Sequence, residues 1–468
     1  MSESKKPNIV FFFTDDQRFD TIRALGNEEI STPNIDRLVA RGTSFTSAHI
    51  PSGSHGAVCM PSRAMLHTGR TLFHLEGSGE RIPAEHTTLG EALREAGYET
   101  FGTGKWHNGC GSYHRSFSSG AEIFFGGMAD HWNVPAYDYD PSGCYEATRP
   151  ECADPMRSNA VRHRRCDHIR VGRHSSELLA DAAVDFLDGH GEEKPYWLYL
   201  SFLAPHDPRT MPKRFLDMYD PAEVRLPENF MGGHSFDNGA LHVRDEELAG
   251  FPRTEAEVRR HNEEYYAMIS HLDEQVGRVM DRVEARGDLE NTIFVFAGDN
   301  GLAVGRHGLF GKQNCYEHSV RVPLIFAGPG IPAGERRDTF VYLLDIFPTL
   351  CDLADVSVPK SVEGRSLAGA IGDGNVTVRD RLFFAFERYQ RAVKDERYKL
   401  IEYVVDGRHN MTQLFDLAND PSELRNLASD PAYRERLDGM RRMLTEMRDE
   451  WNDTIPEWGG KFWRGFSG

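Results

Sequence analysis

The stretch NIVFFFTDD at residues 8–16 joins an apolar segment to two acidic side chains. Residues 8–13 are rich in β-formers and too short for a membrane helix, so they predict a buried strand of a parallel sheet. A second run, TIFVFA at residues 292–297, has the same character and ends in GDNG at residues 298–301. Two buried strands are therefore expected to deliver polar side chains where the backbone leaves the core.

The polar side chains after these strands predict a cation site. In open α/β sheets, ligands bind outside the carboxyl ends of the strands, so the two loops are expected to meet in one crevice. Taken alone, the Asp-Asp pair is more often a helix cap or a solvated turn, and GDNG is most simply a tight turn. Three carboxylates and an amide suit Ca²⁺ or Mg²⁺ better than zinc, which prefers nitrogen and sulfur. The predicted ligands are Asp15, Asp16, Asp299 and Asn300.

A cysteine motif and three basic segments accompany these loops. Cys59 lies in a Cys-x-Pro-x-Arg pentapeptide within AVCMPSRAMLHTGR at residues 57–70. The pentapeptide alone recurs by chance in long chains. Further along, residues 98–107 contain Lys105 and His107, residues 195–208 contain His206, and residues 311–325 contain Lys312. In this order, over roughly residues 7–430, the motifs resemble those of the formylglycine-dependent sulfatases.

The resemblance implies an α/β fold, the alkaline-phosphatase-like α/β/α sandwich with a central, largely parallel sheet. It also implies a smaller C-terminal α+β domain with an antiparallel sheet, so the expected domains are residues 1–371 and 372–468. Independently, apolar residues at 89, 92, 93 and 96 before a glycine predict a helix over 88–97. In the C-terminal part, strands are expected at 382–386, 391–393 and 398–403, and a helix at about 429–451.

The resemblance further implies a reaction. Cys59 would become formylglycine (3-oxoalanine), whose hydrate attacks sulfur beside the cation and counts among the cation's ligands. Asp299 is the expected proton acceptor of that attack, His206 would protonate the leaving alcohol, and His107 would accept the proton whose loss expels sulfate. The remaining cationic side chains would neutralise the sulfate. The expected catalytic residues are Cys59, Arg63, Lys105, His107, His206, Asp299 and Lys312.

Two loop-rich segments, 110–174 and 206–252, are expected to set substrate specificity. The first lacks helix or strand periodicity, contains several aromatic residues and ends in an arginine-rich run at 157–174. It is interpreted either as a lining of the substrate pocket or as a solvated basic loop or oligomer contact. The expected substrate-binding residues are Lys105, His131, Arg164, Arg165, His206, Arg209 and Lys312.

Composition limits the partners. The 468 residues are 39% hydrophobic with a mean hydropathy of -0.53, which is typical of a soluble globular protein. A net charge of -18 argues against nucleic acid or an anionic membrane. The seven cysteines lack a Cys-x-x-Cys element and are expected to be reduced. No apolar leader precedes residue 8, so a cytoplasmic protein is expected as written, or a periplasmic or secreted one if a signal peptide has been removed.

The expected function is hydrolysis of a sulfuric ester, most simply of a sulfated carbohydrate, after activation by a formylglycine-generating maturase. Ca²⁺ is the expected cation, with Mg²⁺ or Mn²⁺ as alternatives. The alternatives are a phosphonate or phosphate monoester hydrolase of the same superfamily and a choline-sulfatase-like enzyme for a small sulfated molecule. Asn300 favours a sulfatase, because relatives with phosphonate activity tend to carry histidine there. A non-enzymatic sulfoglycan-binding protein is disfavoured, since every motif residue needed for turnover is present.

Overall fold

A central sheet of eight strands carries the predicted functional loops. The computed structural model describes residues 5–154, 156–191 and 193–466. In it, β1 (Asn8–Thr14) lies between β11 (Tyr196–Ser201) and β12 (Thr292–Gly298) and runs parallel to both. The order across the sheet is β14 (Glu335–Arg337), β2 (Gly42–Phe45), β13 (Leu324–Ala327), β12, β1, β11, β5 (Glu99–Lys105) and β6 (Ser119–Phe124).

Five neighbouring strands, from β12 to β6, are parallel, whereas β13 runs antiparallel to both of its neighbours. Every residue of β1 is buried, as expected for a parallel strand covered on both faces. The carboxyl ends of the five parallel strands therefore meet at one edge of the sheet.

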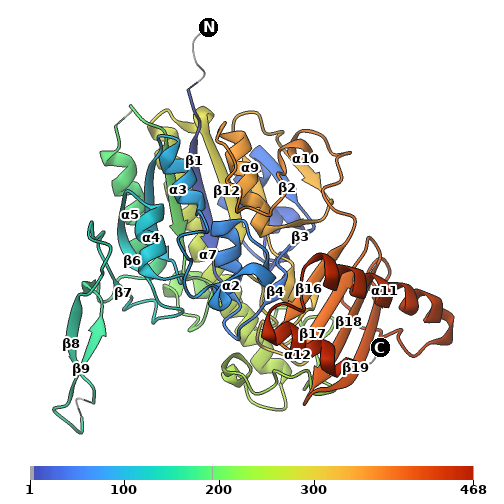
Figure 1. Cartoon of the computed structure of the whole chain (residues 1–468). Helices are drawn as coiled ribbons and strands as arrows, with labels where there is room; N and C mark the ends of the chain where they lie inside the picture. The colour runs from blue at the N-terminus through green and yellow to red at the C-terminus, as the bar shows by residue number, and fades with distance from the viewer. Residues whose placement is uncertain (1–4, 155, 192, 467–468) are drawn as a thin grey trace.

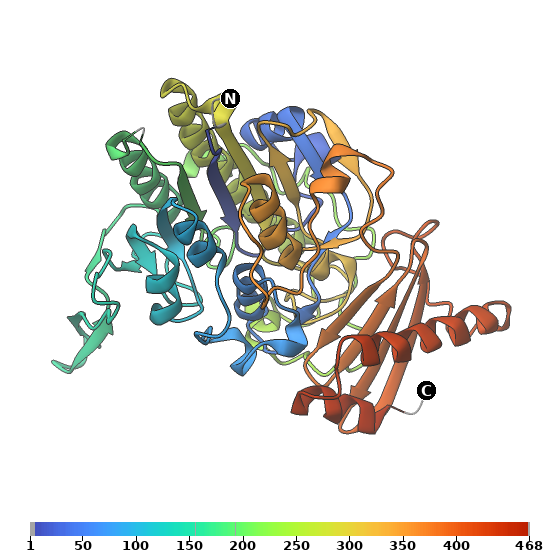
Figure 2. The ribbon, with the colours of Figure 1, turned by 45° about the horizontal axis from the view of Figure 1, so that its top comes forward.

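Helices cover both faces of the sheet (Figures 1 and 2). Side chains alternate along β1, so Phe11 and Phe13 enter one core and Val10 and Phe12 enter the other. The predicted α/β/α sandwich is thus confirmed. The first core is closed by α2 (Cys59–Thr68), α3 (Leu89–Glu95), α4 (Cys110–Ser116), α9 (Ile346–Leu353) and α10 (Ala368–Gly372), and the second by α1 (Pro33–Arg41), α5 (Ser175–Gly189) and α7 (Glu255–Ala285).

A smaller five-stranded sheet forms the C-terminal part, which lies beside the α/β body in Figure 1. Four of its strands are antiparallel and follow one another in sequence, which confirms the predicted C-terminal sheet. The fifth, β4 (Ser52–Gly53), pairs in parallel with β16 and comes from the segment just before Cys59. The four antiparallel strands are β16 (Leu382–Phe386), β17 (Gln390–Lys394), β18 (Tyr398–Val405) and β19 (Arg408–Asp416).

Two helices pack against this sheet. α11 (Arg434–Glu450) buries Met440, Leu444 and Met447, and α12 (Glu457–Gly465) buries Phe462. The helix expected from about residue 429 begins later, because residues 431–433 form a 3-10 turn capped by a side chain at 430. The proposed domain boundary between 371 and 372 falls in the last turn of α10 and stays a prediction.

Residues 110–174 are more regular than their sequence suggested. α4 and β6 belong to the α/β body, so the prediction that this part is an irregular loop, made from its lack of periodicity, was wrong for these two elements. Beyond them, β7 (Pro135–Ala136) pairs with β10 (His168–Ile169). Between these two, β8 (Thr148–Cys152) and β9 (Val161–Arg165) form an antiparallel hairpin that projects from the body in Figures 1 and 2.

The remaining short elements are β3 (Ala48–His49), which pairs with β15 (Val341–Tyr342), and the helices α6 (Lys213–Leu216) and α8 (Glu317–Val320). All seven cysteines are free thiols, as expected. None of the helices in the described part of the chain has the length and apolar character needed to cross a membrane.

Candidate active site

The loops after β1 and β12 meet at the edge of the central sheet. The backbone N–H of Asp16 donates to Asp299 Oδ1 at 3.0 Å, and the N–H of Asp299 donates to Thr14 O at 3.0 Å. Asp16 has a φ of 66°, a left-handed conformation that short polar residues tolerate. Parallel pairing of the two strands therefore brings together acidic residues that lie 283 positions apart in the chain.

A group of buried oxygen atoms at this point fits a cation. Carboxylates of Asp15 and Asp299 and the Sγ of Cys59 offer ligand atoms within 4.8 Å of one another. Asn300 Nδ2 donates to Asp16 Oδ1 at 2.7 Å, so Asn300 adjoins the same carboxylates. Among the described residues, Asp15 Oδ1 and Asn300 Oδ1 are buried without a hydrogen-bond partner. A bound divalent cation would satisfy both oxygens.

Two lysines supply positive charge beside these carboxylates. Lys105, the last residue of β5, places Nζ 2.5 Å from Asp15 Oδ2. Lys312 places Nζ 2.6 Å from Asp16 Oδ1. Burial raises the pKa of Asp299, and the neighbouring charge of Asp15 raises it further. Burial acts in the same direction on Asp15, but the charges of Lys105 and other cations outweigh it and hold the pKa of Asp15 below its usual range.

Cys59 is the first residue of α2 and is buried beside these groups. Its Sγ lies 3.4 Å from Lys105 Nζ and 3.5 Å from His107 Nδ1. Burial raises the pKa of the thiol. Burial, followed by the charges of Lys105 and Arg63, lowers the pKa of His107 well below its ordinary value, so this imidazole is neutral. A neutral histidine 3.5 Å from residue 59 is placed to accept a proton.

Arg63 lies one helical turn after Cys59, with a fully buried side chain. Its Nε donates to Asp299 Oδ2 at 2.9 Å, and its Nη1 donates to Ser201 Oγ at 2.7 Å and to Lys105 O at 3.0 Å. The guanidinium thus joins the ends of β5, β11 and β12 beneath the site. The sequence predicted the position of Arg63 but not that it holds Asp299 in place.

His206 follows β11 and enters the cluster from a fourth strand end, after those of β1, β12 and β5. Its Nε2 lies 3.7 Å from Asp16 Oδ2, while its Nδ1 lies 2.9 Å from Asp207 O and 3.2 Å from Asp207 Oδ1. Because Nδ1 is engaged with Asp207, Nε2 is the nitrogen that faces the cluster. His206 was predicted from sequence, whereas Asp207 was quoted only as part of the surrounding segment.

A polar chain continues outward from Asp207. Arg244 forms an ion pair with both carboxylate oxygens of Asp207, and its Nη1 lies 2.9 Å from Asp245 Oδ1. Asp245 Oδ2 accepts from Gln313 Nε2 at 2.7 Å, and Gln313 Oε1 accepts from the backbone N–H of Lys312 at 2.9 Å. The chain therefore connects His206 to the lysine loop. Its side chains come from three separated segments, so no local sequence signal revealed it.

Arg209, an expected substrate-binding residue, contacts α7. Arg209 Nη1 lies 2.9 Å from His261 Nδ1, and its guanidinium lies 5.9 Å from the ring centre of Tyr265, so it faces α7. Nε and Nη2 of Arg209 are buried without a hydrogen-bond partner among the described residues. The role of Arg209 in substrate binding stays a prediction.

His131 is buried and has both ring nitrogens engaged. Its Nε2 lies 3.0 Å from His206 O, and its Nδ1 lies 2.7 Å from Ser175 Oγ. The ring therefore supports the backbone of His206, and neither nitrogen is left to bind substrate. The expectation of a direct substrate contact by His131 is corrected to a supporting position.

Arg164 and Arg165 lie on β9 of the projecting hairpin. Arg164 pairs with Glu151 at 3.2 Å, and Arg165 Nη2 donates to Tyr145 O at 3.4 Å. Figure 1 shows the hairpin extending away from α2, at whose start Cys59 lies. The structure thus brings Lys105, His107, His206 and Lys312 together but does not bring these two arginines to them.

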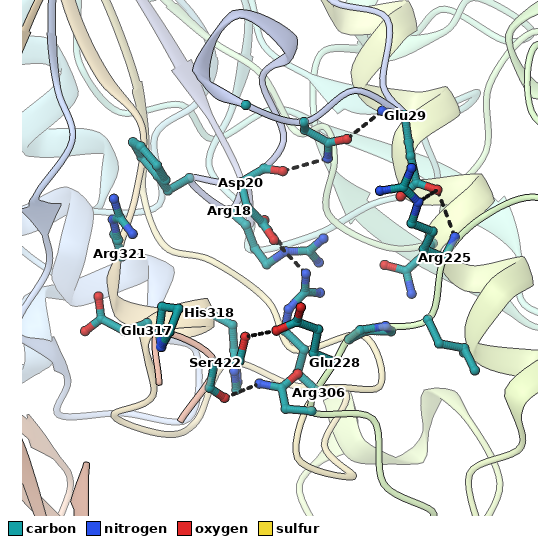
Figure 3. A pocket seen from close by; sticks show the side chains of 18 of the residues that line it. Arg18, Asp20, Glu29, Arg225, Glu228, Arg306, Glu317, His318, Arg321 and Ser422 are labelled. Carbon is teal, nitrogen blue, oxygen red and sulfur yellow. Dashed lines mark hydrogen bonds and ion pairs between the residues drawn. The ribbon is translucent and has the colours of Figure 1, made fainter. Parts of the chain in front are cut away.

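A large cavity of about 550 Å³ is separate from the cluster (Figure 3). Asp20 is at its wall and pairs with Arg18 at 2.7 Å and with Arg306 at 2.6 Å. Arg18, two residues after Asp16, lines the cavity, and its Nη1 donates to Leu302 O at 3.3 Å. Its lining lacks the cysteine, lysine and histidine of the cluster, so the reacting groups lie outside it.

Comparisons with known proteins agree with this geometry. The Sulfatase family model matches residues 7–356, and the model for the C-terminal part of N-sulphoglucosamine sulphohydrolase matches residues 305–450. An arylsulfatase of Clostridium perfringens is 31% identical, with 94% of each chain covered. An N-acetylglucosamine-6-O-sulfatase of Bacteroides thetaiotaomicron is 24% identical, with 97% of this chain and 88% of the relative covered.

Solved structures share the fold. The structure of BT4656 in complex with its substrate D-glucosamine-2-N,6-O-disulfate aligns with a TM-score of 0.75 at 22% identity, covering 97% of this chain and 99% of that one. The phosphonate monoester hydrolase of Agrobacterium radiobacter aligns with a TM-score of 0.73 at 21% identity, covering 95% and 96%. At these identities the likeness concerns the fold.

Proposed function

The chain belongs to the sulfatase family and is a sulfuric ester hydrolase, and from this premise we propose that it releases sulfate from a sulfated carbohydrate through formylglycine at position 59. The observation that carries the proposal is the place of Cys59. Its Sγ lies within 4.8 Å of carboxylate oxygens of Asp15 and Asp299 and beside Lys105 and His107. The residue that would attack sulfur therefore lies directly beside the proposed cation ligands and the positive charge of Lys105.

The burial of Cys59 supports its modification. Because burial raises the pKa of the thiol, an unmodified Cys59 would be mostly protonated and a weak nucleophile. Formylglycine at this position supplies a hydrated aldehyde oxygen as the nucleophile. We propose that a formylglycine-generating maturase acts on the chain before it folds, since Cys59 is inaccessible in the folded protein.

Asp15, Asp16, Asp299 and Asn300 would hold the cation, and the two unpartnered oxygens of Asp15 and Asn300 support this donor set. Oxygen ligands favour Ca²⁺, with Mg²⁺ or Mn²⁺ as alternatives. The cation would stabilise negative charge on the sulfate oxygens. Lys105 and Lys312 add two fixed positive charges within the same cluster, in a site from which water is largely excluded.

Two histidines would move protons at stated atoms. His206 Nε2 would donate to the leaving alcohol, because Nδ1 is occupied by Asp207. His107 Nδ1, 3.5 Å from Cys59 Sγ, would accept a proton from the modified side chain. Groups of this kind contribute about 10² to 10⁴ each to a rate, so loss of either histidine should slow the enzyme without erasing all activity.

A sulfated amino sugar is the proposed substrate class. Support comes from the N-acetylglucosamine-6-O-sulfatase relative and from the bound glucosamine disulfate of a structural neighbour. The fold also serves a phosphonate monoester hydrolase, so phosphonate ester cleavage is the second candidate. Against it, position 300 is asparagine, whose amide donates to Asp16.

A substrate panel tests the proposal. The protein, coproduced with a formylglycine-generating enzyme, is incubated with glucosamine 6-sulfate, glucosamine N-sulfate, choline sulfate, an aryl sulfate and a phenylphosphonate ester. We expect release of sulfate from an amino sugar and no release by Cys59→Ala. Preferential cleavage of choline sulfate or the phosphonate would instead establish one of the alternative functions.

A further inference from the structure

The β8–β9 hairpin is a projecting arm. Within the described residues, β8 and β9 pair only with each other, and the side chains along both strands are largely exposed. Figures 1 and 2 show the hairpin extending clear of the α/β body. An isolated two-stranded sheet is marginally stable in water, and its two outer edges present unpaired backbone groups.

The base of the arm is fixed, so the arm points in a defined direction. Tyr145 and Cys166 flank the hairpin and are buried in the main core. The N–H of Cys166 donates to Ala147 O at 3.1 Å, and His168 Nε2 lies 2.7 Å from Glu122 Oε2. The chain thus holds the start and the end of the hairpin firmly while leaving both strands in solvent.

The strand register gathers like charges on one face of the arm. Arg149 stands directly opposite Arg164, and Glu151 stands opposite Arg162. Like charges directly across a strand pair are destabilising unless an anion lies near them. Glu151 pairs with Arg162 and Arg164 but leaves an excess of positive charge on this face.

The charge of the arm is opposite to that of the rest of the chain. Residues 148–165 contain five arginines and two acidic residues, a net charge of +3. Since the whole chain carries -18, the remainder carries -21. Near the tip of the arm, Met156 is 90% exposed and Val161 is 60% exposed, which adds apolar surface suited to a protein partner.

We propose that the arm docks on the acidic body of a second copy of this chain and makes the protein a dimer. A second copy supplies the complementary negative charge and also backbone groups for the unpaired strand edges. A sulfated polymer would supply charge but could not extend the sheet. If two copies exchange arms, each uses the same surfaces, as in a symmetric dimer.

Sedimentation velocity tests the proposal on wild-type protein and on Arg149→Glu/Arg164→Glu. The control is Arg425→Glu/Arg434→Glu, which reverses two exposed arginines outside the arm. We expect the wild type and the control to sediment at twice the chain mass of 52.9 kDa, and the arm variant to dissociate. The dissociation constant should rise at least about tenfold, because close charge pairs across interfaces couple by about 1.5 kcal/mol or more.

Two further measurements complete the test. Arg149→Gln/Arg164→Gln removes the charges without reversing them and should weaken the dimer to a lesser degree, while circular dichroism reports whether each variant is folded. Raising the salt to about 1 M, where the screening length is about 3 Å, should also weaken the wild-type dimer. A wild-type monomer at tens of micromolar, or a folded arm variant that dimerises like the wild type, would overturn the proposal. The proposal would also be overturned if the wild-type protein were a monomer that binds dextran sulfate through the arginines of the arm.

Discussion

The Nδ1 of His206 lies 3.2 Å from Asp207 Oδ1, and the same carboxylate is held from its other side by Arg244. The hydrogen bonds of Asp207 to Arg244, with the charges of His206 and Arg244, outweigh burial and lower the pKa of Asp207 to about 2. Asp207 is therefore ionised at neutral pH. It fixes the ring of His206 with Nε2 toward the site.

Asp207→Asn should reduce kcat by about 10- to 100-fold, less than the factor of about 10² to 10⁴ that a general acid itself contributes, because His206 remains but is no longer held by a carboxylate. Steady-state kinetics on the two variants and the wild type measures the loss. Asp245→Asn is the matched control, since Asp245 contacts Arg244 but not His206. An unchanged kcat in folded Asp207→Asn would contradict the positioning role of Asp207.

Arg63→Met should abolish activity and destabilise the protein, because it leaves Asp299 buried beside Asp15 without its hydrogen-bonded partner. Breaking such a pair costs about 3–5 kcal/mol. Arg391→Met is the control, since Arg391 and Asp453 form another fully buried pair, 2.5 Å apart, in the C-terminal part. Urea unfolding should show similar losses of unfolding free energy for both variants. Of the two, only Arg391→Met should keep its catalytic activity, measured on the soluble, folded fraction. Retained activity in Arg63→Met would contradict its proposed role.

Stability should fall as the pH drops below the ordinary value of histidine. Burial, reinforced by the neighbouring His174, lowers the pKa of His131 to about 3, so the folded ring stays neutral while the unfolded ring takes a proton below about pH 6.5. The loss of unfolding free energy caused by His131 is absent above pH 6.5. It grows by up to about 1.4 kcal/mol per pH unit as the pH falls toward the pKa of His131 in the folded protein.

His131→Gln should therefore show a shallower loss of unfolding free energy between pH 6.5 and 5 than the wild type. Gln keeps a side chain able to hydrogen-bond to His206 O and Ser175. Urea titrations at several pH values give the two slopes. Exposed His55→Gln is the control and should leave the slope unchanged. Equal slopes for the wild type and His131→Gln would show that His131 titrates normally in the folded protein.

Calcium should stabilise the folded protein. A cation would relieve the repulsion among Asp15, Asp16 and Asp299, and a ligand present at 100 times its Kd stabilises by about 2.7 kcal/mol. Thermal melts with EDTA and with added Ca²⁺ measure the effect, and Asn300→Ala should reduce it by removing Asn300 Oδ1 from the donor set. Identical melting temperatures with EDTA and with Ca²⁺ would argue against a cation at these residues.

The sequence predicted those parts of the site that lie at the ends of apolar strands. Asp15 and Asp299 follow continuous hydrophobic runs, and a parallel sheet brings such strand ends to one edge. Asp207 with Arg244 could not be predicted as a pair, because their contact depends on how a long loop folds back. The place of His131 behind the His206 backbone could not be predicted, because burial cannot be read from a single histidine. Arg164 belongs to a hairpin whose strands bury no face, so it shows no clean periodicity.

The most direct test of the account is the mass of the peptide that carries residue 59, measured on preparations with different degrees of maturation and compared with their rates of sulfate release. Conversion of cysteine to the aldehyde lowers the mass by about 18 Da, a change distinct from the oxygen-adding steps of ordinary thiol oxidation. The account predicts that the rate rises in proportion to the converted fraction and vanishes when residue 59 is unmodified cysteine. Full sulfate release from protein in which Cys59 is unconverted would contradict it.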